Sequence, residues 1–192
     1  MAVRPITVIG HKALHAPTKK VREITDEVRT LVADMFDTME AAEGVGLAAN
    51  QVGSRARIFV YDCPPERGDD GEHARGVVVN PVLERLGSPA PLDEEEDGEG
   101  CLSVPGEWFP LARHPRARVT GTDLEGNEVV VEGVGLLARC LQHETDHLDG
   151  YLYVDRLTGP IKTEAREAVK DRGWAADGIL RWDPASTTAD KV

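Results

Sequence analysis

The chain has 192 residues, 41% of them hydrophobic, which is enough for one globular domain with a sizeable core. No apolar run approaches the ~20 residues of a membrane span, and the first ten residues do not resemble a signal peptide, so we expect no membrane association. A net charge of −12 argues against nonspecific binding to DNA, and three widely spaced cysteines favour a reduced, cytoplasmic compartment over a disulfide framework.

The first predicted element is a helix over residues 25–44. Thr25 is a favourable N-cap, acidic residues follow it, and Gly44 is a plausible stop. The apolar residues of this segment recur at helical spacing: Val28, Leu31, Val32, Met35 and Met39. Two short β-rich segments at 57–62 and 76–80 are predicted strands.

Two segments rich in proline and charge, 63–75 and 87–98, are predicted loops. Six of the seven residues 93–99 are acidic, which is typical of a solvated loop. A second interpretation is that these acids bias the electrostatic field near Cys101.

The second half of the chain begins with a predicted hairpin of strands 116–122 and 127–132. A helix over 134–148 ends at a glycine, and a last helix is predicted over 160–172. Because the strands come as adjacent pairs, we expect an α+β fold, with mixed or antiparallel sheets packed around the helix 134–148. We expect residues 1–172 to form a single catalytic domain and 173–192 a partly disordered tail.

The helix 134–148 carries a His-Glu-x-x-His motif at its end. Residues four apart share a helix face, so His143 and His147 can present two imidazoles to one metal ion. Glu144 is rotated by roughly 100° from His143, where its carboxylate can reach a water beside the metal. Leu136 and Cys140 continue the stripe of the two histidines, which favours an inward face over a surface helix with two solvated histidines.

The third metal ligand distinguishes several classes of protein. The metzincin pattern requires a histidine where this chain has Tyr153. A gluzincin-like peptidase would use a downstream glutamate, Glu164 or Glu167. A cysteine is the third source, and Cys101 lies in a flexible Glu-Gly-Cys-Leu-Ser context.

A closed structural zinc site is a further alternative, with four ligands: Cys101, Cys140, His143 and His147. That arrangement would leave Glu144 without a role. It would also leave unexplained the segment 43–51, which is rich in small residues.

In this segment Val45 lies between two glycines, so its backbone is accessible to an extended peptide. Gln51 brings two N–H donors suited to a developing oxyanion. By itself the pattern also fits an ordinary helix stop followed by a tight turn.

Three motifs, GVGLAANQ, EGCLS and QHETDHLDG, occur in the order and spacing of the peptide deformylase family, which the chain resembles over roughly residues 6–156. The resemblance implies a metal-dependent hydrolase that removes the formyl group from the N-terminal formylmethionine of new polypeptides and releases formate. It implies one Fe²⁺ per chain, replaceable by Zn²⁺, Ni²⁺ or Co²⁺, on three ligands: Cys101, His143 and His147. Glu144 would be the general base and then the acid, and Gln51 with the backbone N–H of Leu102 would hold the oxyanion.

The substrate implied by the resemblance is an N-formylmethionyl nascent peptide. It would lie as an added strand against Val45, Gly46 and Gly100. The methionine side chain would enter an apolar pocket, for which the candidates are Val45, Leu136, Cys140 and the stem of Arg139.

The chain departs from some family members in three places: Arg139, Trp108, and the long loops 63–75 and 87–98, which either cover the cleft or are simply solvated. Arg139 is aliphatic in some of them, which predicts a more polar pocket rim. Trp108 replaces an arginine that some members carry near the substrate backbone.

The last predicted helix has a basic face formed by Lys162, Arg166 and Lys170. One interpretation is transient docking on ribosomal RNA, where the substrate emerges. The other is an ordinary solvated helix.

Overall fold

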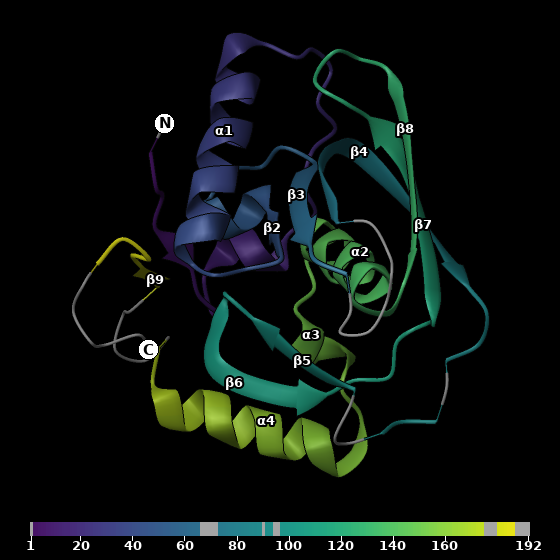
Figure 1. Cartoon of the computed structure of the whole chain (residues 1–192). Coiled ribbons are helices and arrows are strands. Elements are labelled where there is room, and N and C mark those ends of the chain that lie inside the picture. The colour runs from purple at the N-terminus through teal and green to yellow at the C-terminus, as the bar shows by residue number, and fades with distance from the viewer. Residues whose placement is uncertain (1, 66–72, 90, 94–96, 175–179, 187–192) are drawn as a thin grey trace.

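The computed structural model describes residues 2–65, 73–89, 91–93, 97–174 and 180–186 (Figure 1). Its largest sheet has five antiparallel strands in the order β2-β3-β4-β7-β8. The bounds of these strands are β2 Gly46–Ala48, β3 Ile58–Cys63, β4 Ala74–Leu86, β7 Arg116–Thr122 and β8 Glu128–Val134. The α+β fold with antiparallel sheets is therefore confirmed.

Two long helices, α1 (Asp26–Ala41) and α2 (Gly135–Leu148), cover opposite faces of this sheet (Figure 1). Successive side chains of a strand point to opposite faces. On β3, Phe59 and Tyr61 pack in the core of α2, whereas Ile58 and Val60 pack in the core of α1. Since α2 contacts all five strands, it lies at the centre of the fold, as predicted.

A separate two-stranded hairpin, β5 (Gly98–Cys101) with β6 (Val104–Pro110), lies beside α2. Two helices, α3 (Tyr153–Arg156) and α4 (Gly159–Arg172), pack with this hairpin around a third core that contains Val104, Phe109 and Tyr153. Two short 3₁₀ turns contact each other, η1 (Lys12–His15) and η2 (Ala49–Val52); Leu14 of η1 packs in the third core and Ala49 of η2 in the core of α1.

The segment 173–192 differs from its prediction as a tail. Trp174 is buried in the third core, and strand β9 (Arg181–Trp182) pairs with β1 (Ile6–Thr7). Trp174 and Trp182 both pack in hydrophobic cores, so burial of large aromatic side chains ties the described part of this segment to the domain. Residues 175–179 and 187–192, where disorder was expected, lie outside the described residues.

Most of the predicted helices and strands are present within a few residues of their expected bounds. The strand predicted at 76–80 is longer, because β4 passes through a bulge at Asn80–Pro81 and continues to Leu86. Asn80 takes a left-handed conformation there, and its side-chain amide exchanges two hydrogen bonds of 2.8 Å with the backbone of Val21. None of the helices in the described part of the chain has the length and apolar composition that a bilayer crossing requires.

Candidate metal centre

Two histidines near the end of α2 point into the same space. His143 and His147 are buried, and their Nε2 atoms lie 3.1 Å apart. This arrangement follows from the i, i+4 spacing on a helix whose inward stripe packs against the sheet. The two Nε2 atoms are therefore positioned to bind the same ion.

Cys101 completes the cluster from the end of β5. Its Sγ lies 3.2 Å from Nε2 of His147, and the ligand atoms of the three residues all lie within 4.8 Å of one another. Two nitrogen ligands at ordinary zinc or iron bond lengths on a tetrahedral ion are separated by about 3.3 Å. The spacing and the donor set of one thiol and two imidazoles therefore fit a divalent transition-metal ion.

The other candidate ligands lie elsewhere. The thiol of Cys140 donates to the carbonyl of Val45 at 3.5 Å, and Cys140 is outside the three-residue cluster. Glu164 and Glu167 are exposed on α4. Neither the four-ligand zinc site nor the gluzincin-like site is present among the residues that the structure describes.

A buried carboxylate, Glu99, orients His143. Its Oε1 lies 2.6 Å from Nδ1 of His143, and both oxygens also accept hydrogen bonds from Arg113, at 2.6 and 2.9 Å. Burial opposes ionisation of Glu99, but the hydrogen bonds from Arg113 and His143 outweigh it and lower its pKa to about 2. With Nδ1 bonded to this carboxylate, Nε2 of His143 faces the cluster.

The network continues behind the cluster to Asp146, which lies on α2 between the motif's glutamate and its second histidine. Asp146 is buried and accepts from Arg113 at 2.6 Å and from Arg156 at 2.7 Å. Arg113 thus links two carboxylates: that of Glu99, which contacts His143, and that of Asp146, which directly precedes His147 on α2. Sequence analysis missed Arg113 and Asp146, and it assigned Glu99 to an acidic loop.

Glu144 lies beside the cluster without contributing a ligand. Its side chain is 3% exposed, and burial raises its pKa to about 7. Its Oε2 has no hydrogen-bond partner among the described residues. A buried carboxylate oxygen in this situation is available to a water or a substrate.

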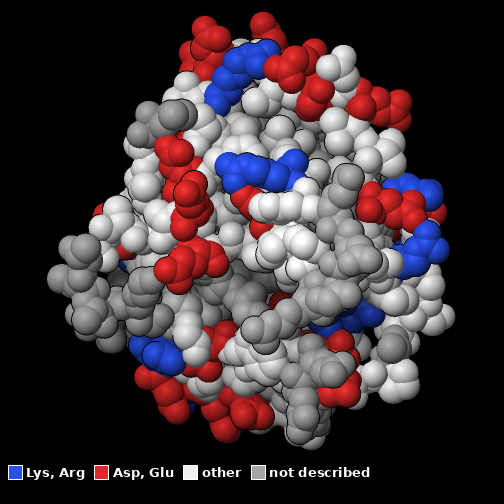
Figure 2. Space-filling model, viewed as in Figure 1, with Lys and Arg blue, Asp and Glu red and all other residues white. Residues whose placement is uncertain are grey.

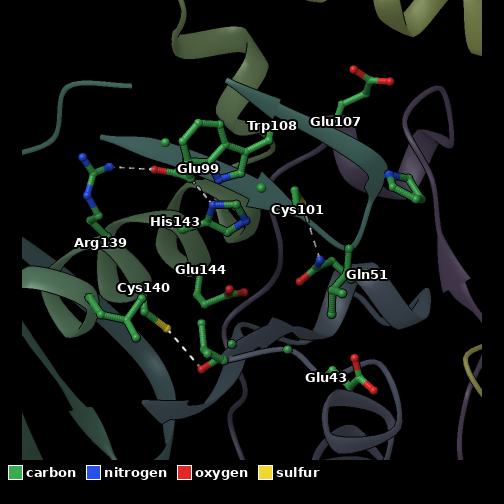
Figure 3. A pocket seen from close by; sticks show the side chains of 18 of the residues that line it. Glu43, Gln51, Glu99, Cys101, Glu107, Trp108, Arg139, Cys140, His143 and Glu144 are labelled. Atoms are coloured by element: carbon green, nitrogen blue, oxygen red, sulfur yellow. Dashed lines mark hydrogen bonds and ion pairs between the residues drawn. The ribbon is translucent and has the colours of Figure 1, made fainter. Parts of the chain in front are cut away.

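Gln51 has its side-chain amide fixed in one orientation. Its Oε1 accepts from the backbone N–H of Ala48 at 2.8 Å, and its Nε2 donates to Oγ of Ser103 at 3.2 Å. The Nε2 atom also lies 3.9 Å from Sγ of Cys101. One amide N–H therefore bonds to Ser103, while Nε2 also faces the thiol of Cys101 in the cluster (Figure 3).

The cluster opens into a cavity of about 690 Å³ between β2 and β5 (Figure 3). It is lined by eleven of the twelve predicted site residues: Val45, Gly46, Gln51, Gly100, Cys101, Leu102, Leu136, Arg139, Cys140, His143 and Glu144. The twelfth, His147, is 1% exposed and lies behind Cys101. Trp108, which the sequence singled out as a departure near the substrate backbone, also lines the cavity, as do Glu43, Gly98, Glu107 and Trp182, which the prediction did not include.

Arg139 contributes its stem to this wall. Its guanidinium is held by Asp97, by Glu99 at 3.6 Å and by the carbonyl of Leu111 at 3.0 Å. The positive charge is therefore neutralised at the rim, and the methylene groups remain available to an apolar ligand.

Known proteins resemble the chain in both sequence and structure. The family model for polypeptide deformylase matches residues 3–163. The peptide deformylase of Mycolicibacterium smegmatis is 53% identical, over 96% of this chain and 95% of the relative, and that of Mycobacterium marinum is 54% identical over the same shares. The crystal structure of Ehrlichia chaffeensis peptide deformylase in complex with actinonin has 36% identity and a TM-score of 0.80, and covers 90% of this chain and 97% of that one.

Proposed function

The chain belongs to the peptide deformylase family, metal-dependent hydrolases that remove N-formyl groups from nascent peptides, and from this premise we propose a role for each site residue. Cys101, His143 and His147 hold one metal ion. The observation that carries this assignment is the convergence of their three ligand atoms beside an oxygen of Glu144 that hydrogen-bonds to none of the described residues. We assign the native ion as Fe²⁺, with Zn²⁺, Ni²⁺ or Co²⁺ as substitutes, since thiolate and imidazole donors suit all four.

Glu144 is the general base and then the acid. A bound divalent ion at this site supplies Lewis-acid polarisation and lowers the pKa of an adjacent water. Glu144 takes the proton from the water as its oxygen bonds to the formyl carbon. The carboxyl group then delivers that proton to the amine nitrogen as the C–N bond breaks, which leaves formate and a free N-terminus.

Gln51 and the backbone N–H of Leu102 stabilise the oxyanion that forms on the former formyl oxygen. Preorganised donors cost no reorganisation at the moment of reaction. The bonds from Ala48 and to Ser103 supply this preorganisation for Gln51.

The peptide binds as an added strand between β2 and β5. Both strands have one edge unpaired with any described strand, and Gly46 and Gly100 on these edges line the cavity. Backbone pairing with Val45, Gly46 and Gly100 supplies affinity without sequence preference. The methionine side chain enters between residues of α2: Leu136, Cys140 and the stem of Arg139.

The natural substrate is an N-formylmethionyl nascent peptide, and we place the enzyme in the cytoplasm as one catalytic domain. Figure 2 shows several groups of acidic side chains on one face of the molecule, in line with the net charge of −12, so DNA is not an expected partner.

Transient ribosome contact through Lys162, Arg166 and Lys170 is a further part of the proposal. Charge reversal of these three residues should reduce co-sedimentation with ribosomes; unchanged co-sedimentation would remove this part.

The decisive experiment is anaerobic preparation with Fe²⁺, followed by assay of formate and free amine from formyl-Met-Ala-Ser. Cys101→Ser should lose metal and activity, while Glu164→Ala, the matched test of a gluzincin-like site, should keep both. Absence of formate above background, or full activity in Glu144→Ala with metal still bound, would refute the assignment.

A further inference from the structure

Trp108, on strand β6, is an unusually exposed aromatic residue for a cavity wall. Its side chain is 53% exposed, whereas Trp174 in the third core is 1% exposed. Across the cavity from the β5–β6 hairpin lies Val45, another large apolar residue with substantial exposure, at 36%. Exposed tryptophans lining a cavity are typical of recognition surfaces, because they offer a large apolar face with few rotatable bonds.

The indole ring lies against the backbone of β5 (Figure 3). Trp108 is paired with Gly100 in the hairpin, and the ring reaches back over Gly98. A Cβ atom on Gly98 would lie only 1.4 Å from the ring, and one on Gly100 would lie 3.5 Å from it. The ring therefore covers the same face of β5 to which side chains at positions 98 and 100 would point.

That face is opposite the one that carries Glu99. The side chain of Glu99 reaches His143 on α2, so positions 98 and 100 point away from α2. The side chains of a peptide strand paired along the edge of β5 alternate in the same way. When formylmethionine points toward Leu136 and Cys140 on α2, the next residue of the peptide points toward Trp108.

We infer that Trp108 is a specificity-determining residue, which makes the enzyme prefer an aromatic or large apolar residue directly after formylmethionine. The proposal rests on the strand-like peptide binding proposed above. An aromatic pair adds about two- to tenfold to binding, which sets the scale of the preference. A purely structural role, in which the ring only shields the glycines of β5, predicts no dependence on the peptide sequence.

The test compares kcat and KM for three substrates: formyl-Met-Ala-Ser, formyl-Met-Phe-Ser and formyl-Met-Ala-Phe. For the wild-type enzyme, kcat/KM for formyl-Met-Phe-Ser should exceed that for formyl-Met-Ala-Ser by about two- to tenfold. In Trp108→Ala this ratio should fall to near one, mainly through KM because the contact is remote from the reacting atoms. Trp108→Phe should retain most of the preference. The ratio of kcat/KM for formyl-Met-Ala-Phe to that for formyl-Met-Ala-Ser should change little in either variant.

A matched control is Tyr151→Ala, which removes another exposed aromatic residue that stacks on Arg156 outside the cavity and should leave the ratio at its wild-type value. A ratio near one in the wild-type enzyme, or an unchanged ratio in Trp108→Ala, overturns the proposal. Absence of formate from all three peptides would instead refute the proposed function. In that case, affinities of Met-Phe-Ser and Met-Ala-Ser for the wild type and Trp108→Ala still decide whether Trp108 discriminates between them.

Discussion

Replacement of Glu99 by glutamine should weaken metal binding and destabilise the fold together. The carboxylate is 7% exposed and holds both Nδ1 of His143 and the guanidinium of Arg113. A glutamine side chain can offer only one acceptor oxygen, and its NH₂ group would face a donor. The fixed orientation of His143 is then lost.

The expected magnitudes follow from these contacts. Loss of a carboxylate partner behind a histidine ligand typically lowers metal affinity by about 10–100-fold. Removal of one member of a buried ion pair costs about 3–5 kcal/mol. Because Asp146 remains 2.6 Å from Arg113, we expect a loss near the lower end, about 3 kcal/mol, in the free energy of unfolding.

Zinc affinity measured by competition with a chromogenic chelator, and urea denaturation of the metal-free protein, test the two effects separately. The matched control is Glu132→Gln on β8, which removes the same charge from a carboxylate that also contacts two arginines, Arg116 and Arg118, but at the surface. This control should change stability little, because solvent screens the surface ion pairs, and leave metal affinity at its wild-type value. If Glu99→Gln binds zinc as tightly as the control, the orienting role of Glu99 is refuted.

Four further variants test the site and the fold. Glu144→Gln should keep its metal content while kcat falls about 10²–10⁴-fold; metal loss in parallel with activity would contradict a role as base. Gln51→Ala should lower kcat about 10²–10³-fold with little change in KM, and a KM effect alone would argue against oxyanion binding. Gly46→Ala would place a Cβ 2.5 Å from Oε1 of Glu144 and should lower kcat/KM by at least about tenfold, because the carboxylate is displaced. Wild-type kcat/KM in this variant would show instead that the carboxylate can move aside without loss of function. Burial of Asp34 would raise its pKa, but hydrogen bonds from the Ala2 N–H and Arg4 outweigh burial and lower it. The ionised carboxylate therefore stabilises the fold fully above pH ~4, and this stabilisation is lost on further acidification. In urea denaturation, the difference in free energy of unfolding between the wild type and Asp34→Asn should shrink as the pH falls below ~4.

The elements with strong periodicity could be predicted from the sequence. The helices α1 and α2 have apolar residues at helical spacing, and β3 is a run of β-branched and aromatic residues. The same periodicity placed His143 and His147 on the inward face. Motif spacing with the family resemblance then brought together the residues that line the cavity.

The hairpin β5–β6 could not be predicted in the same way. Gly98 and Gly100 are poor strand formers, and the acids before them are typical of a loop. The strand forms because its partner β6 supplies the ladder and the ring of Trp108 covers both glycines. The burial of Glu99 depends on Arg113, fourteen residues away, and no local pattern indicates that contact.

The two unpaired strand edges that border the cavity have a consequence for when the enzyme can act. Exposed edges normally invite pairing with other sheets, but these two, which pair with no further described strand, border the same cavity. If the substrate binds there as an added strand, as proposed above, its terminus has to be extended and cannot already be part of a helix or a sheet. Deformylation thereby competes in time with folding of the substrate, and proteins whose first residues become ordered early have the shortest period in which the enzyme can reach them.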